Sequence, residues 1–418
     1  MKLKNLFGMA AMAALVLSGC SSDEVVENFS PENAIEFGTY VGRDAQGRAS
    51  EVKIEDLQQE NVGFGVYAYY TGASDFVADQ SQPNFMNNQH VTFNSTASTW
   101  EYTPIKYWPN TEGEKVSFFA YAPYGNTNIS APTKNTENFV GSPVLTFTAN
   151  STVANQVDLL YADDMTPDNQ KYDYIDMTKQ GVNDRITFNF KHALSRIGFK
   201  VQALVDYVNK DQNGEANDDA ENSEPIGDET TISVESVELI GNFAQTGYLN
   251  LNGGGWLYGN VANTTYSLGT SDFVTNVANK VTILPQVLNN DDKYMMIIPK
   301  DFDGKDANDA EDATDKIQIK VVYKVKTVDD NLKDGSIEIT NTVTSAPFNF
   351  EFVQGKAYTF VLHLGLTSVK FAAQVNGWDV VDDIAVNVPI NVETTVTPTT
   401  PAPGEGEGDD EKPTAGVA

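Results

Sequence analysis

Short stretches in which apolar and polar residues alternate recur along the chain, and they constrain its fold more than any other feature. Residues 186–190 alternate strictly, and residues 64–70 and 116–123 are rich in aromatic side chains. Asn, Gly, Pro and Thr separate these stretches, and no long segment shows the 3.6-residue period of a helix. Short strands joined by such turns are typical of β-sandwiches, so the sequence predicts an all-β fold.

The strand-like stretches fall into two groups, which predicts two β-sandwiches in tandem. A polar stretch around residues 165–184 indicates a linker between them, and an acidic stretch at residues 210–229 indicates a solvated insertion in the second. We therefore expect an N-terminal sandwich at residues 49–183 and a C-terminal sandwich at residues 184–382. The other predicted strands lie at residues 145–148, 157–161, 194–201, 232–240, 281–284, 294–298, 317–328, 337–343, 348–352 and 358–364.

The first twenty residues have the plan of a secretory signal. Two lysines precede an apolar run at residues 6–17, which is too short to span a bilayer comfortably. A Leu-Ser-Gly sequence then leads directly to Cys20 and resembles the bacterial lipobox, in which the cysteine becomes the lipidated first residue. The alternative is an ordinary signal peptide with an incidental cysteine. We expect removal of residues 1–19 and lipidation of Cys20.

Cys20 is the only cysteine, so core burial and not disulfide bonds must stabilise the exported protein. The Ser-Ser-Asp-Glu sequence that follows it resembles the surface-export signal of Bacteroidetes lipoproteins. The lipobox-like sequence at Cys20 and this acidic sequence together predict a lipoprotein that is sent to the outer cell surface.

Charge and motif content exclude several classes of function. The 27 Lys and Arg residues against 58 Asp and Glu give a net charge of −31, so the chain lacks the basic surface that nucleic acid requires. No nucleophile elbow, P-loop or dinucleotide-binding fingerprint is present, and abundant carboxylates single out no catalytic pair. His90, His192 and His363 lack metal-ligand spacing, and His192 is expected to be a structural residue. We predict no catalytic residue, metal or cofactor.

Two local patterns each have a functional and a structural interpretation. Residues 211–214 and 301–306 contain short acidic spacings, but Gly stands at the fourth position instead of the sixth position of a calcium loop, which favours solvated loops. A second group of side chains offers either a carbohydrate platform or, as large aromatics more often do in a sandwich, part of the core. Its members are Trp100, Tyr102, Tyr107 and Trp108.

Both ends of the chain carry a strand-like pattern with one apolar face. The N-terminal pattern precedes a polar loop at residues 42–48 that contains two arginines, and such loops are common sites of proteolysis. Its face comprises Ile35, Phe37, Thr39 and Val41. The C-terminal face comprises Ile384, Val386, Val388, Ile390 and Val392. Each strand either belongs to its own domain, or loss of the first opens a groove that the second strand of another copy fills.

A series of motifs in a fixed order carries a resemblance to a known family. Besides the lipobox at Cys20, these motifs lie at residues 85–89, 100–109, 116–124, 158–162, 188–195, 355–359 and 375–378. Together they make the chain similar, over nearly its whole length, to the fimbrillin (Mfa-like) family, the type V pilus subunits of Bacteroidetes. The resemblance implies two transthyretin-like β-sandwiches. It also implies surface lipoproteins that lose an N-terminal strand to an arginine-directed protease and receive the C-terminal strand of another subunit.

Applied to this sequence, the resemblance implies cleavage between Arg48 and Ala49. Arg43 is the second choice, because an acidic residue follows it. Residues 20–48 would be released, and residues 383–396 would form the donor strand. The low-complexity tail at residues 397–418 extends beyond the expected end of a polymerising subunit.

The expected partners are other copies of the chain, other fimbrial subunits, an Arg-specific protease and a host or bacterial adhesion ligand. The lipid on Cys20 would hold the precursor in the outer membrane before the protein enters a cell-surface fimbrium. A polymerising, non-enzymatic fimbrial subunit is the favoured function. The alternatives are a fimbrial tip or accessory adhesin, which needs a groove but no donor strand, and a surface glycan-binding lipoprotein.

Overall fold

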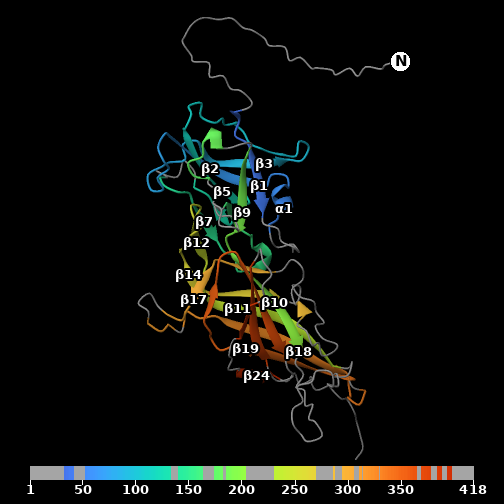
Figure 1. Cartoon of the computed structure of the whole chain (residues 1–418). Helices are drawn as coiled ribbons and strands as arrows, with labels where there is room; N and C mark the ends of the chain where they lie inside the picture. The colour runs from blue at the N-terminus through green and yellow to red at the C-terminus, as the bar shows by residue number, and fades with distance from the viewer. Residues whose placement is uncertain are drawn as a thin grey trace, which may run out of the picture.

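The computed structural model is built almost entirely from β-strands (Figure 1), which confirms the all-β prediction. Helix is limited, in the described part of the chain, to α1 (Ile54–Leu57), the 3-10 turns η2 (Val153–Asn155) and η3 (Lys179–Gly181), and 3-10 conformation at Asn33. None of these could cross a membrane. The structure describes residues 33–41, 52–132, 140–162, 174–181, 185–203, 230–269, 286–287, 294–305, 310–312, 314–328, 330–364, 369–377, 384–387 and 393–397.

The N-terminal part of the chain forms a sheet in which all neighbours are antiparallel except β1 and β9. The strands in spatial order are β1 (Phe37–Val41), β9 (Ile186–His192), β8 (Leu160–Ala162), β5 (Lys115–Ala122), β2 (Phe64–Gly72), β3 (Met86–Asn94) and β4 (Thr99–Glu101). The predicted strands at residues 64–70, 116–123 and 186–190 are therefore present.

The central strands β2 and β5 are buried on both faces, which explains their continuous apolar sequences. Phe64 and Val66 of β2 belong to a core that also contains the side chains of β1 and β9. Tyr67 and Tyr69 point to the opposite face, into a second core shared with later parts of the chain. Aromatic residues at adjacent positions can thus both be buried.

Two further sheets face each other across a third core, as in a β-sandwich. One contains β15 (Gln286–Val287), β10 (Ser195–Ala203), β21 (Lys356–Leu364), β22 (Val369–Gly377) and β23 (Ile384–Asn387), with β16 (Met295–Ile297) also paired to β10. The other contains β14 (Val261–Gly269), β11 (Thr230–Ala244), β18 (Gln318–Val328), β19 (Ser336–Thr344) and β24 (Glu393–Thr397). The short pair β17 (Lys300–Phe302) and β20 (Phe350–Phe352) adds to the same core.

A small sheet connects the two parts of the molecule. Its strands are β13 (Trp256–Tyr258), β12 (Thr246–Asn250), β7 (Val144–Thr148) and β6 (Ile129–Ser130). The pairing of β7 with β12 joins residues about one hundred positions apart, from Thr246 opposite Thr148 to Asn250 opposite Val144. The core beneath it also contains Met296 and Ile298, so the two parts share both a ladder and apolar packing.

The polar stretch at residues 165–184 does not behave as a simple linker where the structure describes it. Tyr174 is buried in the core beneath the N-terminal sheet, and its hydroxyl donates to the carbonyl oxygen of Thr187 at 3.0 Å. The same hydroxyl accepts the N–H of Asn189 at 2.8 Å. The following strand, β9, was expected in the second sandwich but pairs with β1 and β8 of the first sheet. The predicted features at residues 210–229 and 281–284 lie outside the described residues.

Candidate functional site: the groove that holds the N-terminal strand

Residues 33–41 are inserted between two separate parts of the chain. On one side β1 runs parallel to β9, from Phe37 opposite Ile186 to Val41 opposite Phe190. On the other side, Ile35 N–H donates to the carbonyl oxygen of Lys106 at 2.9 Å, and Trp108 N–H donates to that of Asn33 at 2.9 Å. The two sides hold different stretches of the segment: residues 33–35 bond to residues 106–108, and β1, an edge strand of its sheet, bonds to β9. We call the space that residues 33–41 occupy between these two walls the groove.

The side chains on the predicted inward face of this segment are the more buried ones. Ile35 and Phe37 are 1% and 2% exposed, whereas Tyr40 on the opposite face is 45% exposed. Thr39 and Val41 are half-buried, and Val41 packs against the same core. The Phe37 ring contacts four other aromatic rings, those of Phe64, Tyr102, Phe118 and Phe188, at centroid distances of 5.3–6.3 Å.

Polar side chains hold the N-terminal end of the segment. Tyr102 is mostly buried, and its hydroxyl donates to the carbonyl oxygen of Ile35 at 2.8 Å. Burial raises the pKa of Tyr102 to about 12, because the phenolate would lose hydration there. Lys179 also donates a hydrogen bond to the side-chain oxygen of Asn33. These hydrogen bonds fix the position of the segment along the groove, in addition to the apolar packing of Ile35 and Phe37.

The residues on either side of the stretch 42–51 both lie near the C-terminal end of β9. Val41, the last residue of β1, lies opposite Phe190. Val52 N–H then donates to Oδ2 of Asp158 at 3.1 Å, and Nδ1 of His192 lies 2.7 Å from the same oxygen. The Asp158 side chain is fully buried, so this pair forms a fixed attachment point, in agreement with the structural role expected for His192.

The predicted processing residues are all outside the described residues. Cys20 lies before the first described segment, and Arg43, Arg48 and Ala49 lie between Val41 and Val52. Their lipidation and cleavage stay predictions. What the structure adds is that both ends of the stretch at residues 42–51 are held beside one end of β9.

The predicted donor strand is divided between two sheet edges. Within the described residues, Ile384 and Val386 belong to β23, which pairs with β22, and residues 393–397 form β24, which pairs with β19. Val388, Ile390 and Val392 lie between these strands and outside the described residues. Since each of these strands has a described neighbour on one side only, both can separate from their sheets without breaking another described ladder.

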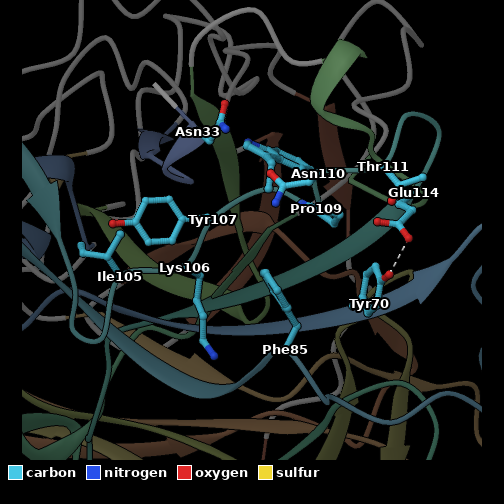
Figure 2. A pocket seen from close by; sticks show the side chains of 11 residues that line it. Asn33, Tyr70, Phe85, Ile105, Lys106, Tyr107, Pro109, Asn110, Thr111 and Glu114 are labelled. Atoms are coloured by element: carbon cyan, nitrogen blue, oxygen red, sulfur yellow. Dashed lines mark hydrogen bonds between the residues drawn. The ribbon is translucent and has the colours of Figure 1, made fainter. Parts of the chain in front are cut away.

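The proposed aromatic platform is mostly core. Tyr102 and Trp108 are buried, and Trp100 packs against the rings of Phe64 and Phe93 at centroid distances of 4.9 and 5.1 Å. Trp100 and Tyr107 are both half-buried, and Tyr107 lies beside an open cavity of about 590 Å³ (Figure 2), which the buried Trp108 also lines. The structural interpretation of these aromatics is therefore correct for three of the four residues.

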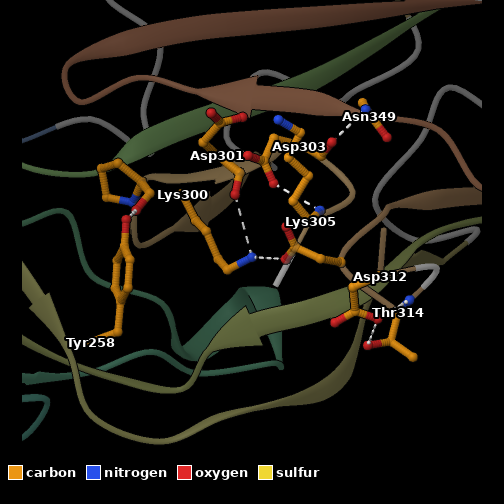
Figure 3. A network of polar contacts seen from close by, with 10 residues as sticks. Tyr258, Lys300, Asp301, Asp303, Lys305, Asp312, Thr314 and Asn349 are labelled. Carbon is orange, nitrogen blue, oxygen red and sulfur yellow. Dashed lines mark hydrogen bonds and ion pairs between the residues drawn. The ribbon is translucent and has the colours of Figure 1, made fainter. Parts of the chain in front are cut away.

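The described residues of the acidic stretch 301–306 are held by hydrogen bonds within the stretch and to its neighbours (Figure 3). Asp303 accepts the N–H of Lys305 at 2.9 Å, and the backbone oxygen of Asp303 accepts the side-chain amide of Asn349 at 2.7 Å. Lys300 forms an ion pair with Asp315. No group of three or more His, Cys, Asp or Glu residues that could hold a metal occurs within the described segments. Residues 211–214 lie outside them.

Comparisons with known proteins agree with the fold. A fimbrium subunit, Fim1C of Phocaeicola vulgatus, is 27% identical over 415 residues, which cover 93% of this chain and 100% of that protein. The crystal structure of a fimbrial protein from Bacteroides vulgatus matches with a TM-score of 0.59 at 20% identity, over 83% of this chain and 99% of the other, and shows a shared fold. The family described as fimbrillin-like matches residues 48–378. The chain therefore belongs to the fimbrillin-like family.

Proposed function

We propose that this protein is a structural, non-enzymatic subunit of a cell-surface fimbrium and that it polymerises by strand exchange. The observation that carries the proposal is the position of residues 33–41, which bond through residues 33–35 to one wall of the groove and through β1 to the other. Removing such a segment would leave unpaired backbone groups and an open apolar groove. A strand from a second subunit restores both kinds of contact, in the manner of β-strand addition. The similarity to Fim1C supports the same function.

The proposed donor strand has a more uniformly apolar inner face than the segment that it would replace. Thr39 contributes a hydroxyl oxygen that is buried and has no hydrogen-bond partner among the described residues, which costs about 1–3 kcal/mol. The donor face of residues 384–392 is aliphatic at all five positions. Each buried aliphatic side chain contributes about 1.5–3 kcal/mol. Exchange therefore replaces a partly polar inner face with a fully apolar one.

Export and activation precede this exchange in the proposed sequence of events. The lipid on Cys20 anchors the precursor in the outer membrane, and an Arg-specific protease cleaves between Arg48 and Ala49, which releases residues 20–48. The attachment of Val52 to the Asp158–His192 pair supports this site, because it fixes the chain just behind the cleaved bond. The family match begins at residue 48 and ends at residue 378, so it leaves out both segments that we expect to be exchanged.

The domain organisation that we propose is two transthyretin-like sandwiches followed by a donor strand at residues 383–396. The pairing of β9 with β1 and β8 favours a first sandwich that continues to His192, instead of the boundary at residue 183 that the sequence predicts. The β7–β12 ladder then joins the two sandwiches.

Controlled proteolysis tests the proposal. Purified precursor is treated with an Arg-specific protease, and unboiled samples are separated on a denaturing gel. We expect cleavage after Arg48 to produce a ladder of oligomers, Arg48→Ala to prevent both cleavage and ladder, and Arg43→Ala to behave as the wild type. A protein that is fully cleaved after Arg48 but remains monomeric would refute polymerisation by strand exchange.

A further inference from the structure

The cavity of about 590 Å³ lies at one end of the groove (Figure 2). Asn33, the first described residue of the removable segment, lines it, together with residues of the wall that pairs with this segment. Tyr107 contributes both to the wall, opposite Ala34, and to the cavity. Removal of residues 20–48 would therefore make the groove and the cavity one continuous surface.

The cavity is lined by aromatic faces with polar groups at its rim. The rings of Tyr70, Phe85 and Tyr107 surround it in Figure 2, and none of the three is fully buried. Tyr70 is fixed by a hydrogen bond from its hydroxyl to Glu114 at 2.8 Å. The amide of Asn110 is exposed at the rim and provides a donor for a backbone carbonyl. Aromatic grooves with such donors bind proline-rich segments in the polyproline II conformation, whose carbonyls have no internal partner.

The chain contains one segment with this chemistry, and the strand exchange leaves it without a role. Residues 398–403 read Pro-Thr-Thr-Pro-Ala-Pro, a P-x-x-P sequence without charge in a protein of net charge −31. The segment begins directly after residue 397, where β24 ends, and so follows the proposed donor strand. It lies outside the described residues.

The direction of the donor strand decides whether this tail reaches the cavity. The released strand is parallel to β9, with Asn33 at its beginning. An incoming strand antiparallel to β9 would have its C-terminal end beside Asn33, and antiparallel pairing is slightly the more stable arrangement. The five residues of β24 between the donor face and Pro398 span up to about 17 Å when extended, so the tail reaches a cavity that starts at Asn33.

We propose that this cavity binds the proline-rich tail, residues 398–403, of the subunit whose donor strand fills the groove. The inference rests on the proposed strand exchange and extends it. It assigns a function to the tail as a second attachment point, which raises the effective concentration of the donor strand at its groove. It also requires the donor strand to run antiparallel to β9.

Peptide binding tests the cavity independently of polymerisation. A fluorescently labelled peptide of residues 393–405 is titrated into full-length precursor, and its anisotropy is measured. We expect saturable binding that Tyr107→Ala weakens about tenfold, as does replacement of the three prolines of the peptide by alanine. Tyr248→Ala, which removes an aromatic ring that is 39% exposed on β12, is the matched control and should bind normally. Absence of binding, or binding that Tyr107→Ala leaves unchanged, would overturn the proposal.

Fibre stability separates this inference from the strand exchange itself. After cleavage at Arg48, protein without residues 398–418 should still form the ladder, but its oligomers should dissociate in urea about tenfold faster than those of the wild type. Tyr107→Ala should have the same effect, and combining the two changes should add nothing. Ladders of equal lifetime would refute the tail contact and leave strand exchange intact. Absence of a ladder in every variant would refute strand exchange, while the peptide titration still decides whether the cavity binds the tail.

Discussion

Phe37 anchors residues 33–41, the segment whose removal we propose. It is 2% exposed and touches four aromatic rings. We expect Phe37→Ala to lower the free energy of unfolding of the precursor by about 3–5 kcal/mol, measured by urea denaturation. Tyr40→Ala, on the exposed face of the same strand, should change it by no more than about 0.5 kcal/mol. After cleavage at Arg48 and release of the segment, both variants should unfold like the wild type, and a persistent difference would mean that the segment stays bound.

Because of Tyr102, the attachment of residues 33–41 should weaken at alkaline pH. Burial raises its pKa to about 12, above the ordinary value of about 10, so the folded state favours the neutral hydroxyl that donates to Ile35. This contribution is complete below about pH 10 and is lost as the pH rises towards 12. Tyr102→Phe should lower the free energy of unfolding of the precursor by about 1 kcal/mol at pH 8. It should also reduce the decline between pH 10 and 12. Equal declines in both proteins would contradict this role.

The donor strand makes a prediction at the level of the element. If residues 383–396 form the proposed donor strand, Val388 and Asn391 would point to opposite faces, and only Val388 would enter the groove of the next subunit. We expect Val388→Asp to abolish the oligomer ladder after cleavage, because an unpaired carboxylate would be buried, whereas Asn391→Asp should polymerise normally. Loss of the ladder in both variants would instead indicate that the added charge acts without regard to the face of the strand.

Alternation and aromatic content predicted most strands but not their partners. The pattern at residues 35–41 correctly places Ile35 and Phe37 inside, because the period of two fixes which side chains share a face. It could not indicate that β1 pairs in parallel with β9, since that contact joins positions about 150 residues apart. The polar sequence around Tyr174 likewise gave no indication that this tyrosine is buried. Its hydroxyl forms hydrogen bonds with the backbone of β9, a strand that the local sequence does not reveal as a neighbour.

At the scale of the whole molecule, the acidic charge and the ladder between β7 and β12 are compatible with the proposed polymer. Most of the net charge of −31 lies beyond residue 48, so in the proposed polymer it would repeat with every subunit and keep fibres soluble and apart. The sequence indicated two groups of strands, yet it gave no sign that β7 and β12 form one ladder, because five-residue strands with unremarkable patterns carry no information about distant partners. In the proposed fimbrium, that ladder would let tension pass between the two parts of a subunit through paired strands as well as through the connecting chain.

The joining sheet makes a final prediction about cooperativity. Leu249 of β12 lies opposite Leu145 of β7, and both are fully buried in the shared core. Because the two parts share this core, calorimetry of the precursor should show a single unfolding transition, and Leu249→Ala should shift the whole transition down by about 2–5 kcal/mol of stability. Leu257→Ala, on the adjacent strand β13 and 72% exposed, should leave it unchanged. Two separate transitions in the wild type, with only one affected by Leu249→Ala, would show that the ladder does not couple the two parts.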